Sequence, residues 1–232
     1  MNVLAFDTCF GAVSAAVCST DAEGLRVLAE SYEARTSGHA ERLVPMIDET
    51  VQRSGLALGD IDRLAVTMGP GGFTGVRVGV AAARALSLAT GKPAVGVTSL
   101  AAMAHEARRL LSDASQGRLL VVAVDARAGM VYVQAFDDVS AGEALLLDPM
   151  DAAALIGRRP AVIVGSGAAA VASLVADAGG RAEVALADLQ PHARAVAALA
   201  ADLDPTGSVR PLYLRRPDAK VQGDKSIPRA AP

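Results

Sequence analysis

Two stretches of the chain share one order of apolar and polar positions. The shared order is an apolar run, an aspartate, three spacers, a glycine and an alternating segment, and it occurs at residues 3–17 and 119–135. The aspartates and glycines of the two copies are Asp7, Gly11, Asp125 and Gly129. An unbroken apolar run is typical of a fully buried strand, and alternation is typical of a half-buried one. We therefore predict two similar hairpins in which the glycine has a positive φ.

After each hairpin the pattern changes to alternating strands and helices. In the first half the pattern predicts strands at 25–32, 64–68 and 94–97, and helices at 40–51, 74–90 and from about residue 100. In the second half it predicts strands at 143–147 and 161–164, and helices at 151–156 and from about residues 168 and 191. This order predicts an α/β fold of two similar lobes, with mixed sheets flanked by helices and a cleft between the lobes.

We expect an N-terminal lobe at residues 1–113 and a C-terminal lobe at 114–216. The remaining residues, 217–232, are polar and hold three prolines, so they are expected to form a disordered tail. Asp7 and Asp125, each at the end of a buried strand, are expected to face the cleft from opposite sides. The alternative interpretation is that each aspartate only caps a turn.

Composition narrows the classes of function. The chain has 232 residues, 52% of them apolar, and 22 Lys and Arg against 25 Asp and Glu, for a net charge of −3. This balance argues against a strongly basic, autonomous nucleic-acid binder. The small number of aromatic residues, with no Trp, three Tyr and four Phe, argues against a stacking platform for nucleic acid. No apolar run approaches the roughly 18 residues of a membrane span, and a basic signal-peptide start is absent, so we expect a cytoplasmic protein.

A glycine-rich loop between a predicted strand and a predicted helix is the most informative motif. It consists of Gly69, Pro70, Gly71, Gly72, Phe73, Thr74 and Gly75. Backbone N–H groups at such a helix start can bind a phosphate, although the sequence matches neither the Walker loop nor the dinucleotide fingerprint. A tight strand-to-helix turn explains the glycines equally well. Together with Asp7, Thr8 and Asp125, the loop forms a degenerate phosphate-loop-like set.

The helix that follows the loop is apolar nearly all round. Its only charged residues between 76 and 89 are Arg77 and Arg84, whereas an outer helix normally has one polar face. Its far side must therefore be covered by the neighbouring helix or by another protein. The candidate partner surface consists of Ala40, Leu43, Val44, Ile47, Val76, Val80 and Ala83.

Four segments together carry a family resemblance. They are residues 6–8, 37–45, 69–79 and the sequence Pro211-Leu212-Tyr213-Leu214-Arg215, and they resemble the TsaB family over residues 2 to about 216. The resemblance implies a duplicated actin-like (RNase H-like) fold. It also implies a non-catalytic subunit of the bacterial complex that makes threonylcarbamoyladenosine beside the tRNA anticodon. The implied partners are the catalytic subunit TsaD in a heterodimer, the ATPase TsaE, and tRNA indirectly through the complex.

The sequence departs from the pattern of TsaD at the positions that matter for chemistry. TsaD has a His-x-x-x-His metal pair where this chain has Ser99 and Met103, neither of which suits the metal that such chemistry needs. We therefore expect no metal site and no catalytic residue. Cys9 stands where the first phosphate loop of the fold usually has glycine, and Phe10 follows it, so we expect no cofactor in the isolated chain. ATP or ADP is expected only in the assembled complex.

Two other functions stay open at this point. The first is an actin-like-fold enzyme with its own ATPase or acyl-transfer activity, which would use Asp7 and Asp125. The second is a regulator that only forms homodimers through the same apolar helices. The histidines lie in separate segments, and His105 and Glu106 are expected on a solvated helix face.

Overall fold

The computed structural model describes residues 1–112, 117–205 and 207–214. The predicted tail at 217–232 lies outside these residues. None of the helices in the described ranges has the length and apolar character needed to span a membrane.

The N-terminal half forms a five-stranded mixed sheet in the order β3-β2-β1-β4-β5. Its strands are β1 (Asn2–Asp7), β2 (Ala12–Asp21), β3 (Gly24–Ala34), β4 (Arg63–Thr67) and β5 (Ala94–Val97). β1 pairs antiparallel with β2 and parallel with β4, because a short turn joins the first pair and a helical crossover joins the second. A short 3₁₀ turn at Leu58–Asp60 precedes β4.

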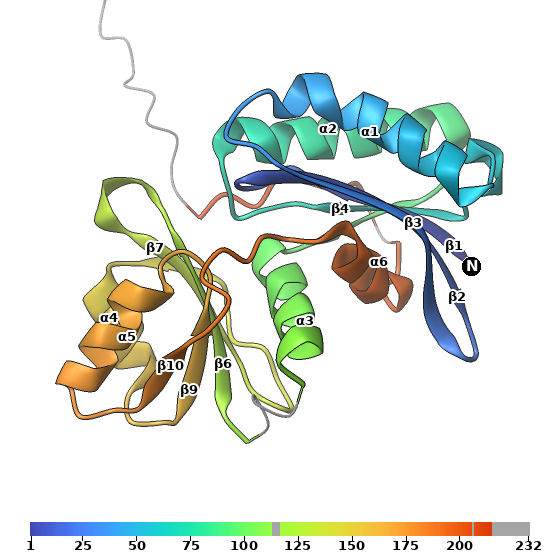
Figure 1. The fold of residues 1–232 in the computed structure, drawn as a ribbon. Coiled ribbons are helices and arrows are strands. Elements are labelled where there is room, and N and C mark those ends of the chain that lie inside the picture. Colours follow the sequence, from blue (N-terminus) through green and yellow to red (C-terminus); the bar gives the residue numbers. More distant parts are fainter. Residues whose placement is uncertain (113–116, 206, 215–232) are drawn as a thin grey trace, which may run out of the picture.

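Helices α1 (His39–Ser54) and α2 (Phe73–Thr90) cover one face of this first sheet (Figure 1). Both helices end at a glycine with a left-handed backbone, Gly55 and Gly91, which is the usual way to stop a helix. The predicted range for α2, 74–90, is within one residue of the observed range.

The C-terminal half repeats the same topology in the order β10-β9-β6-β7-β8. Its strands are β6 (Leu119–Asp125), β7 (Val131–Phe136), β8 (Leu145–Leu147), β9 (Ala161–Val164) and β10 (Ala182–Val184). Helices α4 (Pro149–Ile156) and α5 (Ala168–Asp177) cover one face, and a 3₁₀ turn at Arg127–Gly129 joins the hairpin. The predicted duplicated α/β fold is confirmed, although β10 was not predicted from the sequence.

The two remaining helices lie between the sheets, and each packs on the sheet of the other half of the chain. Helix α3 (Ser99–Leu111) follows the last strand of the first sheet but packs on the second sheet, and α6 (Ala193–Ala201) follows the second sheet but packs on the first. Figure 1 shows both helices sandwiched between the two sheets. The division of the chain into two lobes after residue 113 stays a prediction. Helix α3 comes before this division and packs on the second sheet, and α6 comes after it and packs on the first.

The hairpin glycines have different roles in the two halves. Gly129 has φ +71°, as predicted. Gly11 is not among the residues with positive φ, so the prediction is wrong there. Its N–H instead donates to the side-chain oxygen of Gln190 (2.8 Å), which ties the first hairpin to the segment before α6.

Candidate functional site

Asp7, the last residue of β1, is fully buried. Its Oδ1 accepts hydrogen bonds from the Cys9 N–H (3.1 Å) and from the Thr67 hydroxyl, while Oδ2 has no hydrogen-bond partner within the described residues. Burial raises the pKa of Asp7 to about 6, and the hydrogen bonds from Thr67 and Cys9 offset only part of that rise. The expectation that Asp7 faces the cleft is therefore wrong, because its side chain has no surface exposed to solvent.

The glycine-rich loop packs directly on the turn after β1. The Gly72 N–H donates to the Cys9 carbonyl (2.7 Å), and the Thr8 hydroxyl donates to the Gly75 carbonyl (2.7 Å). A Cβ atom at Gly75 would lie 1.9 Å from the Thr8 carbonyl oxygen, and one at Gly71 would lie 2.5 Å from that of Cys9. The glycines are therefore needed for close contact between two backbone segments, and no phosphate fits between them.

The rest of the loop is tied to other parts of the chain. The Gly69 carbonyl accepts from the Ser99 N–H (2.9 Å), and the Pro70 carbonyl accepts from the Ser99 hydroxyl. Gly69 has φ +105°, and a Cβ there would lie 2.7 Å from the carbonyl oxygen of Leu212. Phe73 and Thr74, in the first turn of α2, have exposed side chains.

Asp125 occupies the matching position of the second sheet but is exposed. Its backbone N–H donates a hydrogen bond to the Ser166 hydroxyl oxygen (2.9 Å), in the loop after β9. Within the described residues no hydrogen bond joins Asp7 to Asp125. The two carboxylates therefore have matching places in the two sheets but opposite environments, one buried and one exposed.

Most residues of the predicted partner surface on α1 and α2 are buried, so the prediction is wrong for them. Five of the seven side chains are buried, so the predicted helix phase is wrong for Leu43, Ile47, Val76, Val80 and Ala83, and all of these except Val76 belong to the core between the two helices and the first sheet. Their apolar side chains are used to cover the sheet. Ala40 and Val44 do face outward, and the Val44 residue is 63% exposed.

The outward side of α2 also carries apolar side chains, beside the exposed Arg77 and Arg84. It presents Ala81, Ala85 and Leu88, and Leu88 is 88% exposed. Together with Ala40 and Val44 these residues form what we call the outer face of α1 and α2. Such an uncovered apolar face on two long helices is typical of a protein-binding surface.

Comparison with known proteins identifies the family of this chain. The family model described as "TsaD: tRNA N6-adenosine threonylcarbamoyltransferase" matches residues 27–154. The chain belongs to this family. Within it the chain is of the TsaB type: it is 39% identical over 132 residues to the tRNA threonylcarbamoyladenosine biosynthesis protein TsaB of Haemophilus influenzae, a match that covers 57% of this chain and 52% of that protein.

Two further relatives match nearly the whole TsaB-type chain. An uncharacterized protein of Mycobacterium tuberculosis is 36% identical over 222 residues, which is 94% of each chain. The solved structure of YeaZ from Pseudomonas aeruginosa superposes with a TM-score of 0.74 at 27% identity, covering 92% of this chain and 99% of that one. The architecture of the two duplicated sheets is thus shared with a solved structure that matches 92% of this chain.

Ser99 and Met103, the two positions that the TsaB resemblance contrasts with the histidines of TsaD, are both fully buried in α3. Ser99 holds the glycine-rich loop through the two hydrogen bonds described above. Met103 packs in the core between α3 and the second sheet. Within the described residues no group of three His, Cys, Asp or Glu side chains is placed to hold a metal ion.

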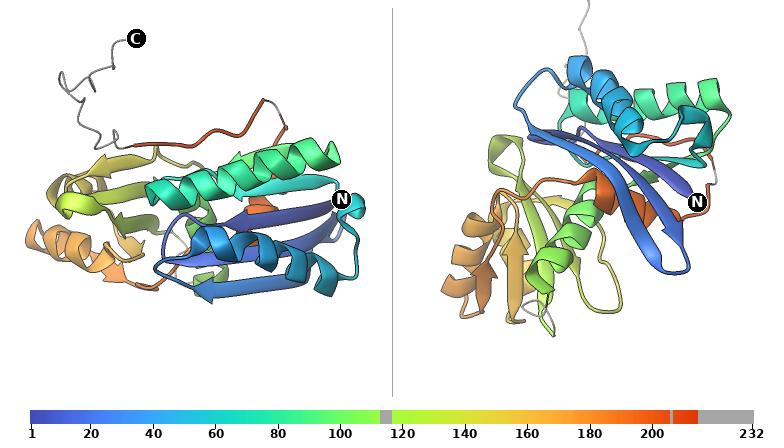
Figure 2. Two further views of the ribbon diagram at one scale, coloured as in Figure 1. Left: turned by 90° about the horizontal axis from the view of Figure 1, so that it is seen from above. Right: turned by 45° about the vertical axis from the view of Figure 1, so that its right-hand side comes forward.

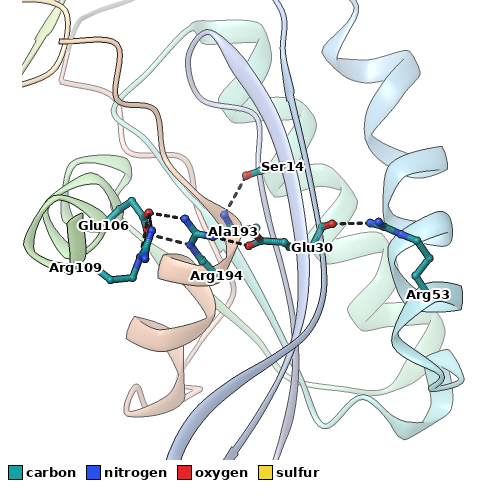
Figure 3. A network of polar contacts seen from close by, with 7 residues as sticks. All are labelled: Ser14, Glu30, Arg53, Glu106, Arg109, Ala193 and Arg194. Atoms are coloured by element: carbon teal, nitrogen blue, oxygen red, sulfur yellow. Dashed lines mark hydrogen bonds and ion pairs between the residues drawn. The ribbon is translucent and has the colours of Figure 1, made fainter. Parts of the chain in front are cut away.

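An ion-pair cluster joins the two exchanged helices to the first sheet, and sequence reasoning missed it. Arg194 at the start of α6 binds Glu106 of α3 (2.6 Å) and Glu30 of β3 (2.8 Å), and Arg109 also binds Glu106 (2.7 Å) (Figure 3). Glu106 is 1% exposed, so its expected place on a solvated face is wrong. Burial raises its pKa, but the hydrogen bonds from Arg194 and Arg109 lower it further, to about 2. The partners are up to 164 residues apart, so no local pattern could reveal them.

Further polar and aromatic contacts, near this ion-pair cluster, connect the start of α6 to β2 and β3. The Ser14 hydroxyl accepts from the Ala193 N–H (3.1 Å) at the start of α6. The rings of Tyr32 and His192 are stacked at a centroid distance of 4.6 Å. The ion-pair cluster and these contacts therefore hold α6 against the first sheet through side chains from both halves of the chain.

Proposed function

We propose that this chain is a non-catalytic subunit in the biosynthesis of threonylcarbamoyladenosine in tRNA, acting through a catalytic partner of the TsaD type. The observation that carries the proposal is the direct backbone contact between the glycine-rich loop and the turn after β1. That contact uses the Gly72 N–H and the close approach that Gly71 and Gly75 allow, both of which a phosphate-binding loop would offer to its ligand. The process is taken from the relatives, since two of them are named tRNA threonylcarbamoyladenosine biosynthesis protein TsaB.

The outer face of α1 and α2 is the surface proposed to bind the TsaD partner in a heterodimer. It is apolar, and it lies on the side of these helices away from their own sheet. TsaE and tRNA would join through the assembled complex. In the absence of TsaD, the same face would support a homodimer, because an apolar surface binds a second copy by the same burial of area.

Nucleotide binding is assigned to the complex and not to the isolated chain. No phosphate fits between residues 8–9 and the start of α2, so we propose no cofactor for the chain alone. ATP or ADP would bind in the assembled complex.

One observation favours a second function. Asp7 is a buried carboxyl group with a raised pKa and an unpartnered oxygen, which are features of catalytic acids. It would support an ATPase or acyl-transfer activity of the chain itself, with Asp125 across the cleft. The burial of Asp7 and the exposure of Asp125 weigh against this alternative.

Size-exclusion chromatography of the chain with and without its TsaD partner tests the proposal. We expect a stable heterodimer, and we expect Ala85→Glu on the outer face to prevent it, because a charge would be buried without a partner. Ala170→Glu, an exposed position on α5 of the second lobe, is the matched control. A chain that hydrolyses ATP alone and loses that activity in Asp7→Asn would replace this proposal by the second function.

A further inference from the structure

The last described segment of the chain lies along one flank of α2. Residues 207–214, which we call the strap, are held by hydrogen bonds from Arg84 to the Val209 carbonyl (2.8 Å) and from Arg77 to the Tyr213 hydroxyl (2.9 Å). The left view of Figure 2 shows the strap running beside α2, on the side away from α1. The Leu212 N–H also donates to the Met68 carbonyl (2.7 Å), which fixes the strap at the end of β4.

This flank carries positive charge only. α2 and the strap contain three arginines, Arg77, Arg84 and Arg210, and no Asp or Glu. No ion pair involves these arginines in the part of the chain that the structure describes. The chain as a whole has a net charge of −3, so the flank differs in sign from the rest of the molecule.

Two exposed aromatic rings lie within the same flank. Phe73 is 46% exposed and Tyr213 is 42% exposed, and their ring centroids are 5.6 Å apart. The Arg77 guanidinium lies 3.6 Å from the centre of the Phe73 ring. The chain has few aromatic residues, yet the fold brings two of them together on the surface, 140 positions apart in sequence, with an arginine stacked on one.

We propose that this surface, the strap patch of Phe73, Arg77, Arg84, Arg210 and Tyr213, binds an unpaired segment of the RNA substrate. The proposal rests on the function proposed above. Guanidinium groups bind phosphates, and exposed aromatic and guanidinium planes stack with unpaired bases without regard to their identity. The strap patch combines both kinds of group along one edge of α2.

The neighbouring outer face of α1 and α2 has a different chemistry. It presents Val44, Ala81, Ala85 and Leu88, which suit a protein helix and not a polyanion. The strap patch is next to it along α2. An RNA held there would lie beside the bound catalytic partner, which is where a substrate must be.

Binding of a fluorescently labelled anticodon stem-loop to the assembled complex tests the proposal, with anisotropy measured at several salt concentrations. Arg210→Glu reverses an exposed charge that makes no described contact, and Phe73→Leu removes a ring while keeping an apolar side chain. We expect each variant to weaken RNA binding about five-fold or more, and Arg210→Glu to reduce the slope of log affinity against log salt by about one. Arg158→Glu, at an exposed position of the second lobe, makes the same charge change and is the control.

The outcomes separate this inference from the proposed function. Unchanged RNA binding in both variants, with a complex that assembles and modifies tRNA, would overturn the strap patch and leave the proposed function standing. Loss of heterodimer formation in Arg210→Glu would also overturn it, by showing that the patch binds protein. A chain that forms no complex with TsaD even without substitution would instead overturn the proposed function. Thermal unfolding of each variant checks that Phe73→Leu remains folded.

Discussion

The first strand of the first hairpin ends in a buried carboxylate, Asp7, whereas the matching strand of the second sheet ends in an exposed one, Asp125. The two sheets have equivalent strand orders, but the helices that cover them differ in length. α1 and α2 have 16 and 18 residues, while α4 and α5 have 8 and 10. The long helices of the first lobe cover their own sheet and still present a wide outer face.

The difference shows how one topology can serve two purposes. In the first lobe the glycine-rich loop makes a direct backbone contact with the turn after β1, and the helix layer that we propose as the docking surface is longer than that of the second lobe. The second lobe keeps shorter helices and contributes α6, which braces the first sheet. The proposed docking surface therefore lies on the first lobe, and α6 packs against the sheet beneath it.

The strongest test concerns the two sides of α2. Ala83→Glu places a charge in the core of the first lobe, and we expect it to lower the free energy of unfolding by about 3–5 kcal/mol. Ala85→Glu, on the outer face, should change that free energy by less than about 0.5 kcal/mol while preventing heterodimer formation. Urea denaturation measures both. Equal stability of the two variants would contradict the helix orientation described above.

A second comparison uses one glycine from each lobe. In Gly75→Ala the new Cβ would meet the Thr8 backbone at 1.9 Å, and a backbone atom cannot move aside easily. We expect a loss of about 3 kcal/mol in the free energy of unfolding. In Gly167→Ala, after β9, the nearest atom is a Val131 methyl group at 3.0 Å, so the loss should be about 1 kcal/mol or less. Similar losses in both variants would mean that the two loops are packed alike.

The ion-pair cluster between the lobes gives a pH-dependent test. The folded pKa of Glu106, about 2, lies below its ordinary value of 4.5, so the cluster stabilises the protein above pH 5 and loses this effect as pH falls from 4.5 toward 2. Glu106→Gln should cost about 2–3 kcal/mol at pH 7, with a smaller difference from the parent chain near pH 3. Glu183→Gln, which removes a surface partner of Arg118 on the second sheet, is the control and should change little. A pH-independent cost would rule out the charge as its cause.

The smallest expected effect is a gain in stability. The folded pKa of Asp7, about 6, lies above the ordinary 3.8, so the free energy of unfolding falls as pH rises from 4 through 6. Asp7→Asn removes this loss and should stabilise the protein by about 1 kcal/mol at pH 7.5, since the amide keeps an acceptor for Thr67 and Cys9. The gain should vanish near pH 4. Thermal unfolding across pH measures it, with the exposed Asp125→Asn as a control that should show no such trend.

Much of the fold could be predicted because its signals are local. The apolar run of β1, the alternation of β2 and the periodicity of α2 each lie within one short segment. The site was harder to predict. The glycine-rich loop and Asp7 were recognised, but the sequence pattern could not decide between a phosphate site and a tight turn. That decision depends on the distance between the Thr8 and Gly75 backbones, which lie on separate segments.

The sequence by itself determined the duplicated α/β topology, the positions of most helices and strands, and the family, because periodicity and motifs are properties of contiguous residues. Only the tertiary structure decided which side of α2 faces the core, where α3 and α6 pack, and that Arg77 meets Tyr213 across 136 positions. An amphipathic pattern fixes a helix phase only when one face is polar. Because α2 is apolar nearly all round, its orientation depends on the sheet beneath it, and the meeting of distant segments depends on how the two lobes pack together.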